Sequence, residues 1–93
     1  METTELIKLI DTTLKAMEQM PDGYVAAYPN ALEGLTPLQL LALADHYKVE
    51  PELDYGNKFR LKIGRDRLIT ATATIVTARK KENAREILMQ HAA

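Results

Sequence analysis

The segment of residues 58–76 alternates between polar and apolar residues, and this alternation constrains the fold of the 93-residue chain more than any other feature. Two alternating runs, Lys58 to Ile63 and Ile69 to Ile75, are separated by a short connection that begins with Gly64. Because successive side chains of a strand point to opposite faces, each run places its apolar residues on one face. The pattern therefore predicts a β-hairpin.

One register of this hairpin keeps all of its apolar residues on the same face. If Gly64 to Leu68 form the loop, the bases of the first strand face the threonines of the second strand. The apolar pairs are then Ile63 with Ile69, Leu61 with Ala71 and Phe59 with Ala73. A shift by one residue would mix the two faces, so the hydrophobic pattern favours this pairing.

Two helices are predicted before the hairpin. Residues 3–20 carry apolar residues at helical spacing, with Thr3 or Thr4 as the N-cap. A second helix, from Thr36 to about Tyr47, begins with a proline at its first helical position. Gln39 stands where it would complete a capping box with Thr36. Residues 24–35 between these helices have no regular pattern.

A third helix is predicted after the hairpin, over residues 78–91, with Ala84, Ile87, Leu88 and His91 on its apolar side. The order helix, irregular segment, helix, strand, strand, helix is typical of a small α+β domain, in which helices pack on a short antiparallel sheet. The alternative is a mostly α-helical fold with one long helix over residues 65–91. No linker is visible, so residues 1–93 are expected to form a single domain.

The charges are divided unequally between the two parts of the chain. From Met1 to Asn57 there are ten acidic and three basic residues, which give a net charge of −7. From Lys58 to Ala93 there are nine basic and three acidic residues, which give a net charge of +6. Such asymmetry bears on partners and association rather than on the fold.

No motif in the sequence predicts catalysis, a metal site or a cofactor. The chain contains neither cysteine nor serine, which removes the usual nucleophiles, and its two histidines lack metal-ligand spacing. The acidic residues Glu50, Glu52 and Asp54 are interpreted as a solvated loop, because a calcium loop would need glycine where Tyr55 stands. We expect a cytoplasmic protein that is not an enzyme and does not span a membrane.

The first functional hypothesis is a small protein-binding or regulatory module, such as an inhibitor or adaptor of the kind that phages and mobile elements carry. It would act through charge-complementary surfaces, since all four tyrosines lie in the acidic part and tyrosine is a frequent interface anchor. The candidate binding residues are Tyr24, Tyr28, Tyr55, Glu50, Glu52 and Asp54.

The alternative hypothesis is nucleic-acid binding through the basic hairpin. The helix that ends near Tyr47 resembles the first helix of a helix-turn-helix, and the hairpin would then be a wing. However, the segment from Glu50 to Asn57, where a recognition helix is needed, is acidic, so this hypothesis ranks second. Its candidate residues are Lys58, Arg60, Lys62, Arg65, Arg67, Arg79, Lys80 and Lys81.

A homodimer is also expected. A two-stranded sheet is marginally stable by itself, so a third strand must come from residues 24–28 or from a second copy of the chain. The acidic and basic parts can also face each other, either within one chain or between two copies.

Overall fold

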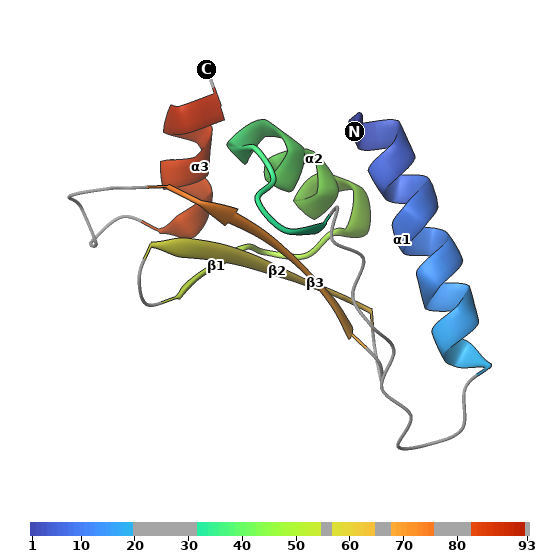
Figure 1. The fold of residues 1–93 in the computed structure, drawn as a ribbon. Coiled ribbons are helices and arrows are strands. Elements are labelled where there is room, and N and C mark those ends of the chain that lie inside the picture. The colour runs from blue at the N-terminus through green and yellow to red at the C-terminus, as the bar shows by residue number, and fades with distance from the viewer. Residues whose placement is uncertain (20–31, 55–56, 65–67, 76–82, 93) are drawn as a thin grey trace.

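The computed structural model describes residues 1–19, 32–54, 57–64, 68–75 and 83–92. These residues form an α+β fold, as predicted, in which α2 and α3 cover one face of an antiparallel sheet and α1 lies beside α2 (Figure 1). The elements are α1 (Thr3–Glu18), α2 (Pro37–Tyr47), β1 (Glu52–Asp54), β2 (Lys58–Gly64), β3 (Leu68–Thr74) and α3 (Ala84–Ala92). The N-terminus and the end of α3 both lie on the helix side of the sheet (Figure 1).

The hairpin of β2 and β3 has the predicted register. Ile63 pairs with Ile69, and the pairing continues in step to Lys58 with Thr74. The inward residues Phe59, Leu61 and Ile63 are buried, whereas the residues between them are at least partly exposed. The alternative of one helix over residues 65–91 is wrong, because Leu68–Thr74 pairs with β2 as a strand.

The third strand comes from the acidic segment, so the interpretation of this segment as a loop is wrong for Glu52 and Asp54, whereas Glu50 lies before the strand. β1 pairs with the start of β2, so the sheet order is β1-β2-β3. The physical reason is Leu53, which packs against the core and gives the segment a strand-like alternation. The chain thus completes a three-stranded sheet without a second copy, and residues 24–28 lie outside the described residues.

The capping of α2 is confirmed in detail. The backbone N–H of Gln39 donates to Oγ1 of Thr36, and the N–H of Thr36 donates to Oε1 of Gln39, both at 3.1 Å. The helix ends at Tyr47, and Lys48 follows in the left-handed conformation at φ 57°. This reciprocal pair of bonds satisfies two backbone donors that a helix start otherwise leaves unpaired.

Two details of the other helices differ from the prediction. The N-cap of α1 is Glu2, and no side chain caps that helix, so the assignment of Thr3 or Thr4 is wrong. In α3, Ala84, Ile87 and Leu88 are buried as expected, but His91 is exposed. α3 runs from Ala84 to Ala92, and residues 78–82 of the predicted helix lie outside the described residues.

One hydrophobic core lies between the helices and the sheet. It joins buried residues of all three helices to the inward faces of β2 and β3, and the described residues contribute no buried polar side chain to it. α1 enters this core through Leu6, Ile10 and Met17. The segment before α2 also contacts the sheet, because the N–H of Leu35 donates to the carbonyl of Thr72 at 2.9 Å.

Candidate functional site

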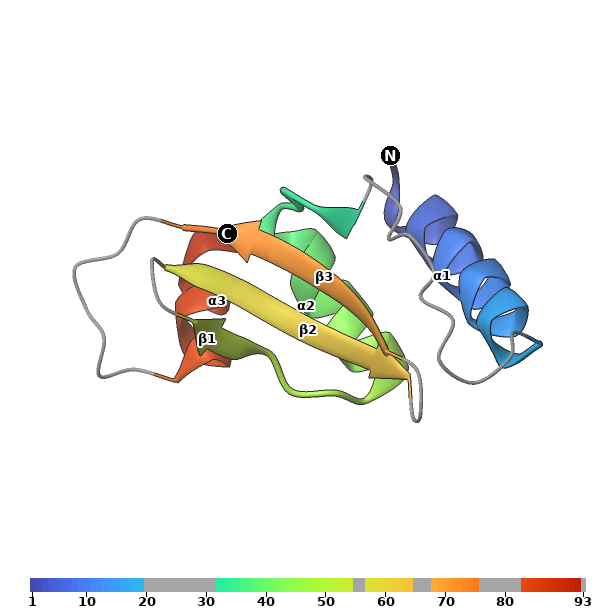
Figure 2. The same cartoon turned by 60° about the horizontal axis from the view of Figure 1, so that its bottom comes forward.

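The candidate functional site is the face of the sheet that points away from the helices, which we call the open face. Figure 2 shows this face toward the viewer, with α2 and α3 behind it. The alternation that buries Phe59 on the helix side places Lys58, Arg60 and Lys62 on the open face. We call these three residues of the central strand the basic row.

Threonines accompany the basic row along its whole length. In the register of the hairpin, Thr74 lies opposite Lys58, Thr72 opposite Arg60, and Thr70 opposite Lys62. Thr74 is exposed, and the other two threonines are partly exposed. The face therefore offers cationic groups beside hydroxyl groups that both donate and accept hydrogen bonds.

The other side of the basic row is bordered by the acidic strand β1. Glu52 lies opposite Arg60 and Asp54 lies opposite Lys58 in the backbone register. Nζ of Lys62 lies 3.7 Å from Oε2 of Glu52, and both side chains are largely exposed. The acidic and basic parts of the sequence therefore face each other within a single chain, at least along this strand pair.

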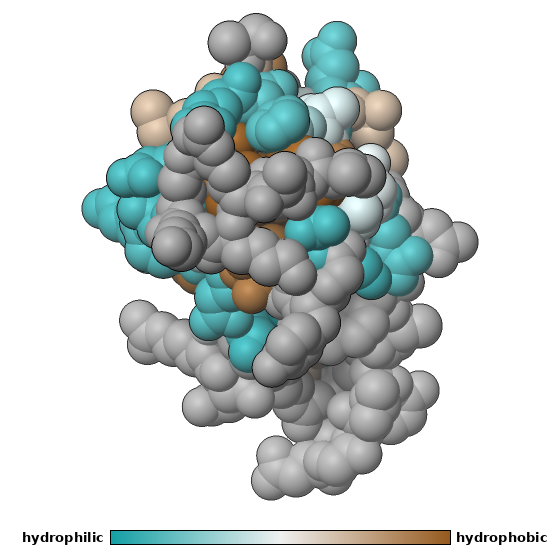
Figure 3. All heavy atoms as spheres, turned by 90° about the vertical axis from the view of Figure 1, so that its left-hand side faces the viewer, coloured by the Kyte–Doolittle hydropathy of each residue, from teal (hydrophilic) through white to brown (hydrophobic). Residues whose placement is uncertain are grey.

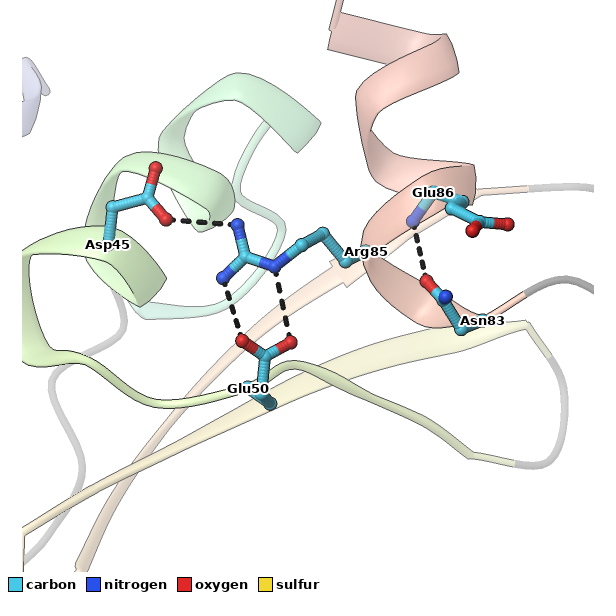
Figure 4. A network of polar contacts seen from close by, with 5 residues as sticks. All are labelled: Asp45, Glu50, Asn83, Arg85 and Glu86. Carbon is cyan, nitrogen blue, oxygen red and sulfur yellow. Dashed lines mark hydrogen bonds and ion pairs between the residues drawn. The ribbon is translucent and has the colours of Figure 1, made fainter.

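A second contact between the two parts joins α3 to the end of α2. The guanidinium group of Arg85 donates from Nε and Nη2 to the two carboxylate oxygens of Glu50, each at 3.2 Å, and from Nη1 to Oδ1 of Asp45 at 2.9 Å (Figure 4). The hydrogen bond to Glu50, followed by the one to Asp45, raises the pKa of Arg85, so this group stays charged. Beside it, Oδ1 of Asn83 accepts from the N–H of Glu86 at 2.9 Å (Figure 4).

Arg85→Met should lower the free energy of unfolding by about 1 kcal/mol, since exposed ion pairs contribute little singly and a two-pronged network contributes somewhat more. The loss should shrink at high salt. Urea denaturation at two salt concentrations measures it, with Lys8→Met, an exposed base of α1, as the control. Equal stability of the two variants would show that the Arg85 network adds nothing.

The side chain of Tyr47, in α2, contacts α1. Its hydroxyl group donates to Oδ1 of Asp11 at 2.8 Å, and its ring packs against the core. Burial, followed by the hydrogen bond to Asp11 and the charge of that carboxylate, raises the pKa of Tyr47 well above its usual value. The side chain therefore has a structural role in joining two helices, as its place on the apolar side of α2 indicates.

The raised pKa of Tyr47 predicts a loss of stability at alkaline pH. As the pH rises above about 10, the unfolded chain loses the tyrosine proton while the folded chain keeps it, so the free energy of unfolding falls. Tyr47→Phe should show a smaller fall between about pH 9 and pH 11. Urea midpoints over this range measure the effect, and parallel curves for the two proteins would contradict it.

The structure places six of the predicted site residues, and the others lie outside the described residues. Glu50 is held by Arg85, Glu52 borders the open face, and Asp54 lies in β1. Lys58, Arg60 and Lys62 are brought together as predicted. The candidates that lie outside the described residues are Tyr24, Tyr28, Tyr55, Arg65, Arg67, Arg79, Lys80 and Lys81. The part that Arg85 plays was missed, because its acidic partners lie 35 and 40 residues away in sequence.

Comparison of the chain with protein-family models gives no match, and comparisons with curated proteins and with solved structures give no significant match. No helix in the described part of the chain is both long enough and apolar enough to cross a membrane. Among the same residues, no group of three or more histidine, aspartate or glutamate side chains is arranged to hold a metal ion. The binding chemistry of the chain therefore has to be inferred from its own surface.

The described helix surface offers less for binding than the open face does. Seen from the side of α3, the coloured atoms are mostly hydrophilic, with small hydrophobic areas between them (Figure 3). Leu38 and Met89 are the exposed large apolar residues of α2 and α3 among those described. Single exposed apolar side chains of this kind are common on monomeric proteins and do not indicate a binding site.

Proposed function

We propose that the chain is a non-catalytic protein-binding module, which recognises its partner through the open face of the sheet. The observation that carries this proposal is the basic row, three cationic side chains in line on a central strand whose other face is covered by helices. A sheet fixes the spacing of such side chains, so they can match a complementary surface with little loss of conformational freedom.

The basic row suits this role better than the acidic candidate residues do. Glu50 is engaged by Arg85, so a partner that used its carboxylate would have to compete with a two-pronged ion pair within the chain. A small module without chemistry of its own acts by occupying a partner's surface. This mode of action suits an inhibitor or an adaptor.

The combined variant Lys58→Gln, Arg60→Gln and Lys62→Gln should bind its partner at least about tenfold more weakly, which corresponds to about 1.4 kcal/mol. The loss arises because the cations that complement the partner are gone while the fold is kept, since the changed side chains lie on the open face. Pull-down from nuclease-treated lysate, followed by mass spectrometry and affinity measurement, tests this prediction.

The matched control is Lys8→Gln, Lys15→Gln and Lys48→Gln, which removes the same charge from exposed positions outside the sheet. Circular dichroism of both variants checks that they are folded. If the basic-row variant captures the same proteins with the same affinity as the control, the open face is not the binding surface and the proposal is wrong.

Nucleic-acid binding is the second candidate function, and the basic row with its threonines favours it as a set of phosphate contacts. Two features place it second. Phe59, the aromatic residue of the described strands, points into the core, and the carboxylate of Glu52 borders the open face. If lysate pull-downs recover only nuclease-sensitive material, and if that binding weakens steeply with salt, this candidate replaces the first.

A homodimer remains a prediction, and one of its reasons no longer holds. β1 supplies the third strand, so a second copy is not needed to complete the sheet. Size-exclusion chromatography at micromolar concentration and physiological salt measures the oligomeric state. Elution as a monomer would leave the open face available to a different protein.

A further inference from the structure

We infer that the partner segment bound by the open face is an extended acidic peptide with its carboxylates at alternate positions. This inference rests on the proposed function and adds the chemistry of the partner to it. It depends on three features of the described residues: the spacing of the basic row, the chain's own acidic strand, and the composition of the face around it.

The spacing of the basic row fits an extended ligand. Alternate residues of a strand lie about 6.6 to 6.8 Å apart, twice the rise per residue. An extended peptide has the same period, so carboxylates at every second position can each lie over one of Lys58, Arg60 and Lys62. The residues between them would point away from the sheet and leave room for variation in the partner.

The chain's own β1 shows that an acidic strand is compatible with the basic row. Glu52 and Asp54, two positions apart, stand opposite Arg60 and Lys58 in the antiparallel register. The ion pair between Lys62 and Glu52 is open to solvent, with 46% and 64% of the two side chains exposed. A ligand carboxylate can therefore reach Lys62 without breaking a buried contact.

The composition of the open face favours a peptide over a nucleic acid. A bound single strand usually stacks its bases on aromatic side chains, and the described part of this face carries none. Glu52 repels phosphates and ligand carboxylates alike, so the feature that favours a peptide is the lack of an aromatic stacking platform among the described residues of this face. The threonines of β3 can exchange hydrogen bonds with peptide groups along the ligand.

Fluorescence anisotropy with labelled peptides tests the inference on the full chain. The probe is a short peptide of alternating glutamate and threonine, and the comparison probe has the same composition with its glutamates contiguous. We expect the alternating peptide to bind at least about fivefold more tightly than the contiguous one. Lys58→Gln with Arg60→Gln and Lys62→Gln should weaken its binding at least about tenfold, while Lys8→Gln with Lys15→Gln and Lys48→Gln should not.

Glu52→Gln gives a test of opposite sign. Removal of this carboxylate frees Lys62 from its partner and reduces repulsion, so the alternating peptide should bind about two- to fivefold more tightly. Weaker binding of the alternating peptide by Glu52→Gln would show that Glu52 supports the bound peptide instead of repelling it, and would overturn the inference. Equal affinity for the two peptides would also overturn it, because binding would then not depend on carboxylates at alternate positions.

A mixed-sequence single-stranded oligonucleotide is the third probe. Tighter binding of the oligonucleotide than of either peptide, with a steep fall in affinity between about 50 and 200 mM salt, would overturn the inference in favour of nucleic acid. A different result separates this inference from the proposed function. If the basic-row variant loses its cellular protein partner but the alternating peptide neither binds nor competes, the face binds protein and the acidic extended ligand is wrong.

Discussion

Phe59→Ala should lower the free energy of unfolding by about 3 to 5 kcal/mol. The ring of Phe59 is 0% exposed and belongs to β2, the central strand, where it packs in the core beneath the helices. Its truncation removes the largest of the fully buried side chains and leaves a cavity that neighbouring strands cannot easily close. Small domains are stable by only about 5 to 15 kcal/mol, so this loss is a large part of the total.

Urea denaturation followed by circular dichroism measures the effect of Phe59→Ala. Phe59→Leu is the matched control, because it keeps most of the volume and should cost much less. Thr74→Ala, at an exposed position of β3, should change the stability by less than about 0.5 kcal/mol. A loss below about 1 kcal/mol for Phe59→Ala would show that the ring does not lie in a tightly packed core.

Ile10→Ala should lower the free energy of unfolding by about 2 to 5 kcal/mol, because Ile10 is 0% exposed and anchors α1 in the core. The hydrogen bonds that join the N-terminal segment to α2 are exposed or partly exposed. One of them runs from Nε2 of Gln39 to the carbonyl of Met1 at 2.6 Å. These links are too weak to replace the lost packing.

The decisive measurement for Ile10→Ala combines urea denaturation with amide hydrogen exchange. If α1 and the sheet unfold as one unit, the whole transition shifts to lower urea and protection falls in β2 as well as in α1. Thr12→Ala, at an exposed position of the same helix, is the control and should have little effect. Loss of protection in α1 alone, with an unchanged main transition, would show that α1 docks independently of the rest.

The hairpin could be predicted from the sequence because its signal is local and redundant. From Lys58 to Ile63 and from Ile69 to Thr74 the apolar residues alternate with polar ones, and only one register keeps the two faces separate. The start of α2 was predictable for a similar reason, since Thr36, Pro37 and Gln39 each favour the same position. Elements of this kind can be predicted from the sequence because several weak local preferences agree.

The features that could not be predicted, β1 and the contacts of Arg85, depend on residues that are distant in sequence. β1 has only Leu53 as an inward residue between two acidic ones, so its strand character comes from pairing with β2 rather than from its own composition. The pairing of Arg85 with Asp45 and Glu50 likewise arises from the packing of α3 against α2, which no local pattern specifies. The basic row could be predicted, but the acidic strand that borders it could not.

The chain ends that belong to α1 and α3 lie on the helix side of the sheet, away from the basic row (Figure 1). A tag, a surface linkage or a fused protein attached at either end would therefore leave the open face accessible. Protein attached to a biosensor chip through either end should bind ligands equally well, because neither linkage approaches the sheet. This geometry makes the protein convenient to immobilise for screening ligands, and equally suited to be carried as a terminal module on another chain.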